Sequence, residues 1–149
     1  MPRTSLFTTP LPPLLLFLAT LQLLPYTTTL LLGPSMLPTI PITGSLAIID
    51  KTKWSKGDVV ICKNANPMNP GLVCKRIHGV EGDTIKSRGV DKKVTKGKVW
   101  LLGDNPSNSL DSRSYGGVES GLVVGRVLGI LSLRGWKGME RRNFDGDKR

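Results

Sequence analysis

Hydrophobic positions divide this chain into an apolar front and a charged body. Up to residue 49 there is no acidic side chain and Arg3 is the only basic one, whereas the other 20 Lys and Arg and all 11 Asp and Glu follow. In the body the apolar positions come in short runs, at residues 46–49, 59–62, 72–77, 99–102 and 122–133. Gly- and Asp-containing turns lie between these runs, and short apolar runs separated by such turns predict a compact, mainly β fold of the barrel or sandwich kind.

The apolar front centres on residues 14–24, LLLFLATLQLL, which lie between two prolines and Pro25. As a helix these eleven residues reach about 16 Å, roughly half of a hydrocarbon core, and extension to Leu32 gives about 28 Å across Pro25 and three threonines. A membrane anchor, the core of a cleaved secretory signal and an organelle-targeting stretch all fit this pattern. We favour the anchor, because residues 27–32 predict a strand, and cleavage would then remove part of the folded body.

The chain therefore divides into three expected parts. Residues 1–32 form the targeting or membrane-anchor segment with its lead-in strand, and residues 33–133 form one folded domain. Residues 134–149 carry six basic and three acidic side chains, which we interpret as a basic, solvated tail.

Composition narrows the chemistry. The net charge of +10 favours an anionic partner, either lipid headgroups or nucleic acid. Aromatic residues make up only 5%, too few for stacking on nucleic-acid bases, so we expect no nucleic-acid partner. Two cysteines and one histidine do not complete a four-ligand zinc site without carboxylates and are too few for a disulfide framework. Cys62 and Cys74 flank one predicted hairpin, where they form a disulfide or, as we prefer, two small buried side chains.

Two polar loops carry candidate chemistry. In GPSMLPT, Ser35 stands between two prolines, whose restricted backbone angles hold a turn rigid. Residues 102–116 are dense in Asp, Asn and Ser, and place Asp111 and Arg113 two positions apart, where their side chains can pair. Taken singly, these segments are typical of a proline-rich connector and a surface loop.

A lysine lies in the segment between them, VCKRIHGVEGD. Alternation along a strand places Lys75 on the same face as Val73 and Ile77. To act as a base at neutral pH, its amine must lose about three pKa units, worth about 4 kcal/mol, which burial among apolar groups can supply. The plainer interpretation is a lysine that extends to solvent from a half-buried strand. His78 falls on the opposite face of a regular strand, so the two side chains are alternative bases.

Together and in this order, GPSMLPT, KRIHGVEGD and GDNPSNSLDSR resemble the three motifs of the type I signal peptidase family, which are membrane-bound serine/lysine proteases. The resemblance covers residues 33–126. Within the family it is closest to the subunit 1 branch of the mitochondrial inner membrane proteases, because the chain is short and contains the GVEGD turn. Asn105 and Arg113 favour subunit 1 over subunit 2. A plastid or bacterial signal peptidase is the alternative.

The resemblance implies a role for each motif residue and a signal-peptidase-like β-barrel or sandwich. Ser35 becomes the nucleophile, Lys75 the general base that is neutral because it is desolvated, and Ser109 the hydroxyl that orients the lysine amine. The backbone N–H of Ser35 becomes an oxyanion donor, whereas Gly33 lacks the side-chain donor that many bacterial relatives have at that position. Structural support of the site is implied for four charged residues: Arg76, Asp104, Asp111 and Arg113.

The implied activity is removal of signal or sorting peptides from membrane-tethered precursors at the mitochondrial inner membrane, on the intermembrane-space side. No metal or cofactor is expected, because the lysine supplies the base, and a heterodimer with the sister subunit is implied. Three other hypotheses remain open. They are a self-cleaving repressor-like Ser/Lys protein, against which the apolar front argues, a basic nucleic-acid-binding module, and a catalytically inactive membrane-anchored partner subunit.

Overall fold

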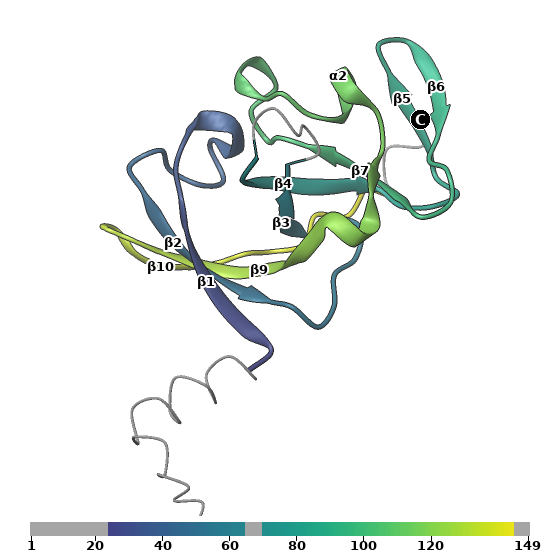
Figure 1. Ribbon diagram of the computed structural model, residues 1–149. Coiled ribbons are helices and arrows are strands. Elements are labelled where there is room, and N and C mark those ends of the chain that lie inside the picture. Colours follow the sequence, from purple (N-terminus) through teal and green to yellow (C-terminus); the bar gives the residue numbers. More distant parts are fainter. Residues whose placement is uncertain (1–23, 65–69, 145–149) are drawn as a thin grey trace, which may run out of the picture.

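The computed structural model describes residues 24–64 and 70–144, and this part of the chain is mainly β, as the sequence predicts (Figure 1). Its strands are β1 (Tyr26–Leu31), β2 (Ser45–Asp50), β3 (Val59–Lys63), β4 (Leu72–Gly79), β5 (Thr84–Ser87), β6 (Val90–Lys93), β7 (Lys98–Leu102), β8 (Val118–Glu119), β9 (Val123–Ser132) and β10 (Gly135–Gly138). Short helical turns are η1 (Pro34–Met36), η2 (Pro106–Asn108), α2 (Ser112–Tyr115) and η3 (Ser120–Leu122).

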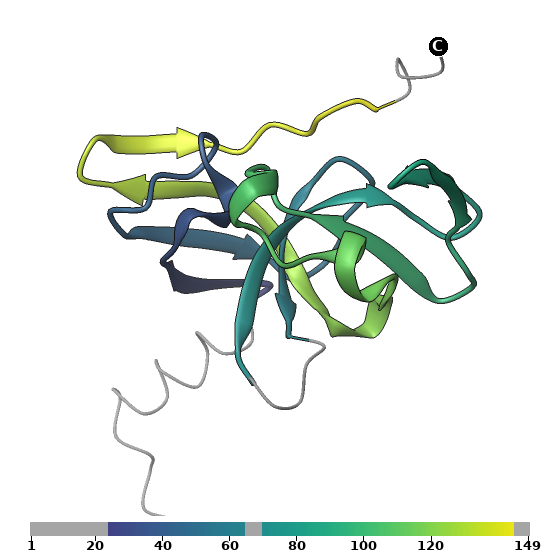
Figure 2. The same ribbon diagram turned by 90° about the horizontal axis from the view of Figure 1, so that it is seen from above.

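Eight of the strands form one antiparallel sheet in the order β1-β2-β9-β3-β4-β7-β8, with β10 added beside β9, and β5 and β6 form a separate hairpin. Strands β1, β2, β9 and β10 lie together at one end of the molecule, and the β5–β6 hairpin lies at the opposite end (Figures 1 and 2). The pairing shifts register within β2 and β3, both against β9, and within β4 against β7. Such bulges bend a strand and increase its twist, so the sheet curls.

The curl buries both faces of β3, the central strand of the core. Val59 and Ile61 belong to one buried cluster, and Val60 and Cys62 belong to the other. Because successive side chains of a strand point to opposite faces, a strand between two apolar layers needs a continuous apolar run. The sequence VVIC is such a run, and it explains why β3 lies in the middle of the sheet.

The two cysteines lie on opposite faces of the β3–β4 hairpin. In its register Cys62 opposes Val73 and Cys74 opposes Ile61, so the thiols point to different clusters, and both are free. Burial raises the pKa of Cys62 to about 11 and that of Cys74 to about 12. The two thiols therefore act as small apolar side chains.

The basic tail is more ordered than the sequence analysis expects. Its first part is β10, antiparallel to β9, and the following residues run back over the turn before β3, where the Arg142 N–H donates to the Gly57 carbonyl at 3.2 Å. A Cβ on Gly57 would lie 2.0 Å from the Arg142 carbonyl oxygen, so this path needs glycine there. Arg141 adds two hydrogen bonds to the buried carboxylate of Asp58, at 2.8 and 3.1 Å. The segment is held by backbone and ion-pair contacts that its polar sequence does not reveal.

No helix within residues 24–64 and 70–144 is both long and apolar enough to cross a membrane. The predicted anchor over residues 14–24 lies, apart from Leu24, outside the described residues. The strand predicted over residues 27–32 is present as β1.

Candidate active site

Lys75 is buried in the middle of β4, where its side chain opposes Val60 of β3. Only 5% of the residue is exposed, and its Nζ donates a hydrogen bond to Ser109 Oγ at 2.9 Å. Burial lowers the pKa of the amine from its ordinary 10.5, and the charge of Arg113 lowers it further, whereas the carboxylate of Asp111 opposes the shift. The site therefore favours a neutral lysine more than water does.

Ser35 lies on η1 and shares a pocket of about 150 Å³ with Lys75. Most of the other residues that line this pocket are apolar, and they come from β1, from the segment 32–41 that contains η1, and from β3 and β4. Met36, next to Ser35, is 2% exposed and packs in the core, which anchors the turn that carries the serine. Ser35 and the buried Lys75, which are far apart in the sequence, thus line one small, mostly apolar space.

Gly103 lies where the two serine-bearing loops meet. A Cβ at this position would lie 2.2 Å from Ser109 Oγ and 2.7 Å from the Ser35 carbonyl oxygen. Only glycine lets both loops approach the end of β7 so closely. The Ser35 carbonyl also accepts a hydrogen bond from the Asn105 N–H at 3.0 Å. The position of Gly103 thus helps bring Ser35, Lys75 and Ser109 to one place.

Asp111 and Arg113 form the pair that their spacing predicts, and they form it at the start of α2, where Asp111 is the N-cap. Asp111 is fully buried and accepts from Arg113 Nε at 2.9 Å and from the Gly103 N–H at 2.9 Å. Burial by itself raises the pKa of Asp111, but hydrogen bonds from Arg113, Gly103 and Ser109 outweigh it and lower the pKa to about 2. The carboxylate thereby ties α2 to the end of β7.

The Asp111 carboxylate stabilises the fold, and this contribution to the free energy of unfolding is lost in acid. The pKa of Asp111 is about 2 in the fold and 3.8 ordinarily, so its contribution is complete above the ordinary value and is lost as pH falls towards 2. That shift corresponds to about 2 kcal/mol. We expect Asp111→Asn to lower the free energy of unfolding near neutral pH, and the difference from the unmodified protein to shrink by about 2 kcal/mol between pH about 5 and 2. Urea unfolding at several pH values measures this. Exposed Asp91→Asn is the control, and a difference that is constant with pH would contradict the assignment.

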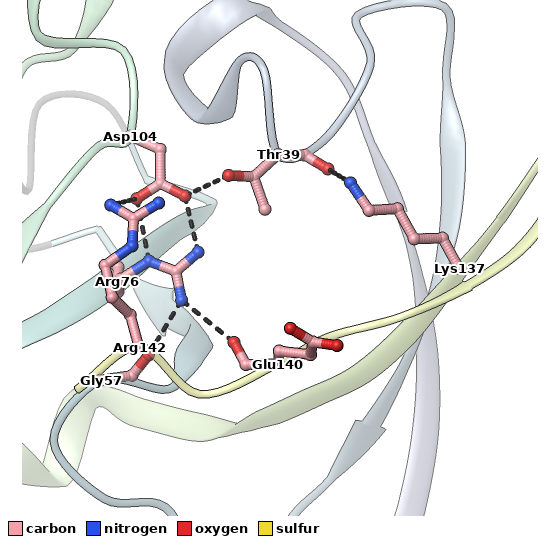
Figure 3. Close-up of polar contacts among 7 residues, drawn as sticks. All are labelled: Thr39, Gly57, Arg76, Asp104, Lys137, Glu140 and Arg142. Atoms are coloured by element: carbon pink, nitrogen blue, oxygen red, sulfur yellow. Dashed lines mark hydrogen bonds and ion pairs between the residues drawn. The ribbon is translucent and has the colours of Figure 1, made fainter.

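Arg76 and Asp104 form a second buried pair (Figure 3). Arg76 Nε and Nη2 donate to the two oxygens of Asp104 at 2.9 and 2.7 Å, and both side chains are 5% exposed. Arg76 Nη1 also donates to the Gly57 carbonyl at 2.9 Å and to the Glu140 carbonyl at 3.4 Å. Burial raises the pKa of Asp104, and the bonds from Arg76 and Thr39 lower it below its usual range. The pair ties the residue after Lys75 to the residue after Gly103.

Thr39 connects this pair to the loop that carries Ser35. Its hydroxyl donates to Asp104 Oδ2, and its carbonyl accepts from Lys137 Nζ at 2.9 Å (Figure 3). Local sequence patterns do not single out Thr39, although it lies within the GPSMLPT motif. Nor do they reveal the roles of Gly103 and Asn105, which lie in the GDN part of the third motif.

His78 does not line the pocket that Ser35 and Lys75 share. Its ring packs edge-on against Phe144, with centroids 4.4 Å apart. Of the two alternative bases, the structure thus places Lys75 beside the pocket. It also brings Ser109 to Lys75, and pairs Arg76 with Asp104 and Asp111 with Arg113.

Lys75 is hydrogen-bonded to Ser109 and lines a pocket with Ser35, which agrees with the family that the three motifs resemble. Residues 86–132 match the model of a family described as signal peptidase, peptidase S26. A curated relative named as a protease is 44% identical over 107 residues and is matched over 67% of its own length. The chain belongs to this signal peptidase family, which confirms the resemblance.

Its relatives include both subunits of one named protease. Mitochondrial inner membrane protease subunit 1 of Schizosaccharomyces pombe is the relative at 44% identity, matched over 64% of this chain. The Xenopus tropicalis subunit 1 is 40% identical over 115 residues, 70% of this chain and 65% of that protein. Subunit 2 of Schizosaccharomyces pombe is 42% identical over 88 residues, 53% of this chain and 48% of that protein. These matches thus span from about half to two thirds of the relatives' lengths.

Proposed function

We propose that this protein is a membrane-bound serine endopeptidase with a Ser35–Lys75 dyad, which removes signal or sorting peptides from precursors at the mitochondrial inner membrane. Its catalytic domain faces the intermembrane space. The observation that carries the proposal is the buried Lys75, whose amine is hydrogen-bonded to Ser109 Oγ at 2.9 Å and which lines the same pocket as Ser35. Relatives named as mitochondrial inner membrane proteases support the compartment, and the match to the signal peptidase family supports the substrate class.

In this mechanism the neutral Lys75 amine removes the proton from Ser35 Oγ, and the oxygen attacks the carbonyl carbon of the scissile peptide bond. The peptide C–N bond then breaks, and Lys75 returns the proton to the leaving amine. Water hydrolyses the ester on Ser35 with Lys75 again as base, which releases the acid product and restores the serine. Both halves require a lysine that is deprotonated near neutral pH, and the burial of Lys75 supports this requirement.

Ser109 and the two ion pairs position the base. Ser109 Oγ accepts from Lys75 Nζ, which fixes where the amine lone pair points. Ser109 also makes the hydrogen bond that lowers the pKa of Asp111, so it connects the Lys75 amine to the Asp111–Arg113 pair. In our proposal the Arg76–Asp104 pair holds β4 against the loop after β7.

An exposed apolar row supports attachment to a membrane. In the sheet register Leu30 of β1 opposes Leu46 of β2, which opposes Leu131 of β9, which opposes Trp136 of β10. These four side chains share one face and are between 41% and 62% exposed. A contiguous apolar surface of this kind fits the lipid boundary, with tryptophan in its preferred interfacial setting. The row begins on β1, the strand that follows the predicted anchor.

We also propose a heterodimer with the sister subunit, because relatives of this chain are named as subunit 1 and subunit 2. A plastid or bacterial-type signal peptidase and an inactive partner subunit are the competing functions. Either function requires the same fold, but only an active peptidase requires the Ser35 hydroxyl.

Precursor processing tests the proposal. The full-length protein, reconstituted in cardiolipin-containing liposomes with and without its sister subunit, is incubated with membrane-tethered precursors, and the new N-termini are identified by mass spectrometry. We expect cleavage that Ser35→Ala abolishes, because the proposed mechanism assigns the attack on the peptide carbonyl to the Ser35 hydroxyl. Ser114→Ala, which changes a serine outside the pocket, is the control. Cleavage that survives Ser35→Ala, or no cleavage under any of these conditions, would exclude the dyad as the working site.

A further inference from the structure

We propose that Asn105 is a positioning residue for the oxyanion of this reaction, because it fixes the peptide group whose N–H stabilises the negative charge. The inference rests on the proposed function, since it concerns a step at Ser35. It assigns a distinct task to a side chain that lies outside the dyad and its ion pairs.

Two hydrogen bonds join Asn105 to the serine turn, from a position far away in the sequence. The side-chain Nδ2 donates to the Pro34 carbonyl at 3.0 Å, and the backbone N–H donates to the Ser35 carbonyl at 3.0 Å. The Pro34 carbonyl also accepts from the Leu37 N–H at 3.2 Å within the turn. Asn105 therefore holds the carbonyl groups on both sides of the Ser35 Cα.

Because the peptide group is planar, the hydrogen bonds from Asn105 also orient the Ser35 N–H. In a trans peptide the C=O and the following N–H lie in one plane and point in opposite directions. The cis bond in this turn is Leu37–Pro38, so the bond between Pro34 and Ser35 is trans. Fixing the Pro34 oxygen thus fixes the direction of the Ser35 N–H, on the side away from Asn105. With the Ser35 carbonyl held as well, the direction of its Cα–Cβ bond, and so the origin of Oγ, is set.

The support behind Asn105 makes the hold rigid. Its neighbour Asp104 is buried and bonded to Arg76 and Thr39, and Gly103 lies against the Ser35 carbonyl. Orientation is decisive, because a donor stabilises an oxyanion only when it already points at the place where charge develops. Gly33, which precedes the turn, has no side chain that could add a second donor. A correctly oriented Ser35 N–H then supplies a large share of the stabilisation of the oxyanion.

Steady-state kinetics of the full-length protein test this role. We expect Asn105→Ala to lower kcat about tenfold and to leave KM within about twofold, because an oxyanion exists only after the substrate is bound. The rise in rate on the acid side of the pH profile reports the pKa of Lys75. It should stay at the same pH, because Lys75 and Ser109 keep their contact. Asn105→Gln, which retains the amide, should recover part of the rate. Asn108→Ala, on the same loop but exposed, should match the unmodified protein.

Binding of two matched peptides supplies a second readout. A peptide aldehyde that ends at the cleaved residue forms a hemiacetal with Ser35 Oγ, in which the carbonyl oxygen takes up the oxyanion position. The same peptide as a C-terminal amide binds without that bond. We expect Asn105→Ala to weaken the aldehyde about tenfold and the amide by less than about twofold. Thermal unfolding of each variant shows whether the fold is retained.

The possible outcomes separate this inference from the proposed function. If the unmodified protein cleaves in a Ser35-dependent way but Asn105→Ala leaves kcat and aldehyde binding unchanged, only the role of Asn105 fails. The same holds if the variant shifts the acid limb, since it would then act through the lysine, or if aldehyde and amide weaken equally. If the unmodified protein shows no Ser35-dependent cleavage and no aldehyde adduct, both proposals fail together.

Discussion

Replacing Lys75 with alanine is expected to lower precursor cleavage by about a thousandfold or more, because the serine hydroxyl is then left without a base. Its burial and its hydrogen bond to Ser109 set this amine apart from the surface lysines. Lys75→Met should cause the same loss, and because methionine keeps most of the apolar stem, the loss would then report on the amine and not on a cavity. Initial rates of precursor cleavage, with thermal unfolding measured in parallel, check the expectation.

His78→Ala is the matched control, because it removes the other candidate base, which packs against Phe144 outside the pocket. We expect this variant to retain most of the activity. If Lys75→Met kept its activity and His78→Ala lost it, the assignment of the base would be reversed.

The same lysine sets the pH dependence of the reaction. Burial lowers the pKa of Lys75 below its ordinary 10.5, with Arg113 acting in the same direction and Asp111 against it. Because only the neutral amine is a base, kcat/KM should rise as pH passes upward through this lowered pKa and level off above it. At pH values between the lowered pKa of the folded state and the ordinary 10.5, the unfolded chain binds more protons than the folded one. Lys75 therefore also makes the fold more stable as pH rises. An acid limb near 10.5 would show that the lysine is not desolvated during turnover.

Gly103→Ala should reduce cleavage by about a hundredfold, through displacement rather than removal of a reacting group. The added Cβ would lie 2.2 Å from Ser109 Oγ and 2.7 Å from the Ser35 carbonyl oxygen, so at least one loop has to move. A shift of about an ångström between reacting groups is enough for a loss of this size. The measurement is kcat/KM on a precursor peptide, together with the free energy of unfolding.

Gly121→Ala is the matched control for this substitution. A Cβ there meets no atom within 4 Å, so neither activity nor stability should change by much. If Gly103→Ala retained full activity, the close approach of the two loops would not be required for the reaction. A loss of stability without a loss of activity would lead to the same conclusion.

The apolar strands could be predicted from the sequence, and the polar ones could not. Strand β3 is buried on both faces and is an unbroken apolar run, and β4 and β7 also carry strong apolar signals. In β6 and β10, by contrast, every residue is exposed. They form by pairing with a neighbouring strand and bury no face of their own, so no alternation marks them. For the same reason the tail from residue 134 was expected to be solvated, and its bonds to Gly57 and Asp58 came only from the fold.

For the candidate site, the sequence by itself determined which chemical groups are present and in what order. Ser35, Lys75 and Ser109 were found because they lie in three short motifs, and each motif is a local property of the chain. The Asp111–Arg113 pair followed in the same way, because its two members are only two residues apart.

Only the tertiary structure decided which of these groups meet. The bond from Lys75 to Ser109 spans 34 positions and the bond from Asn105 to Pro34 spans 71, and such contacts depend on how the curled sheet brings its loops together. The lowered pKa of Lys75 likewise depends on burial, which is a property of everything packed around the amine. The physical reason is that local patterns specify strands and turns, whereas desolvation and the alignment of distant groups arise when those elements pack.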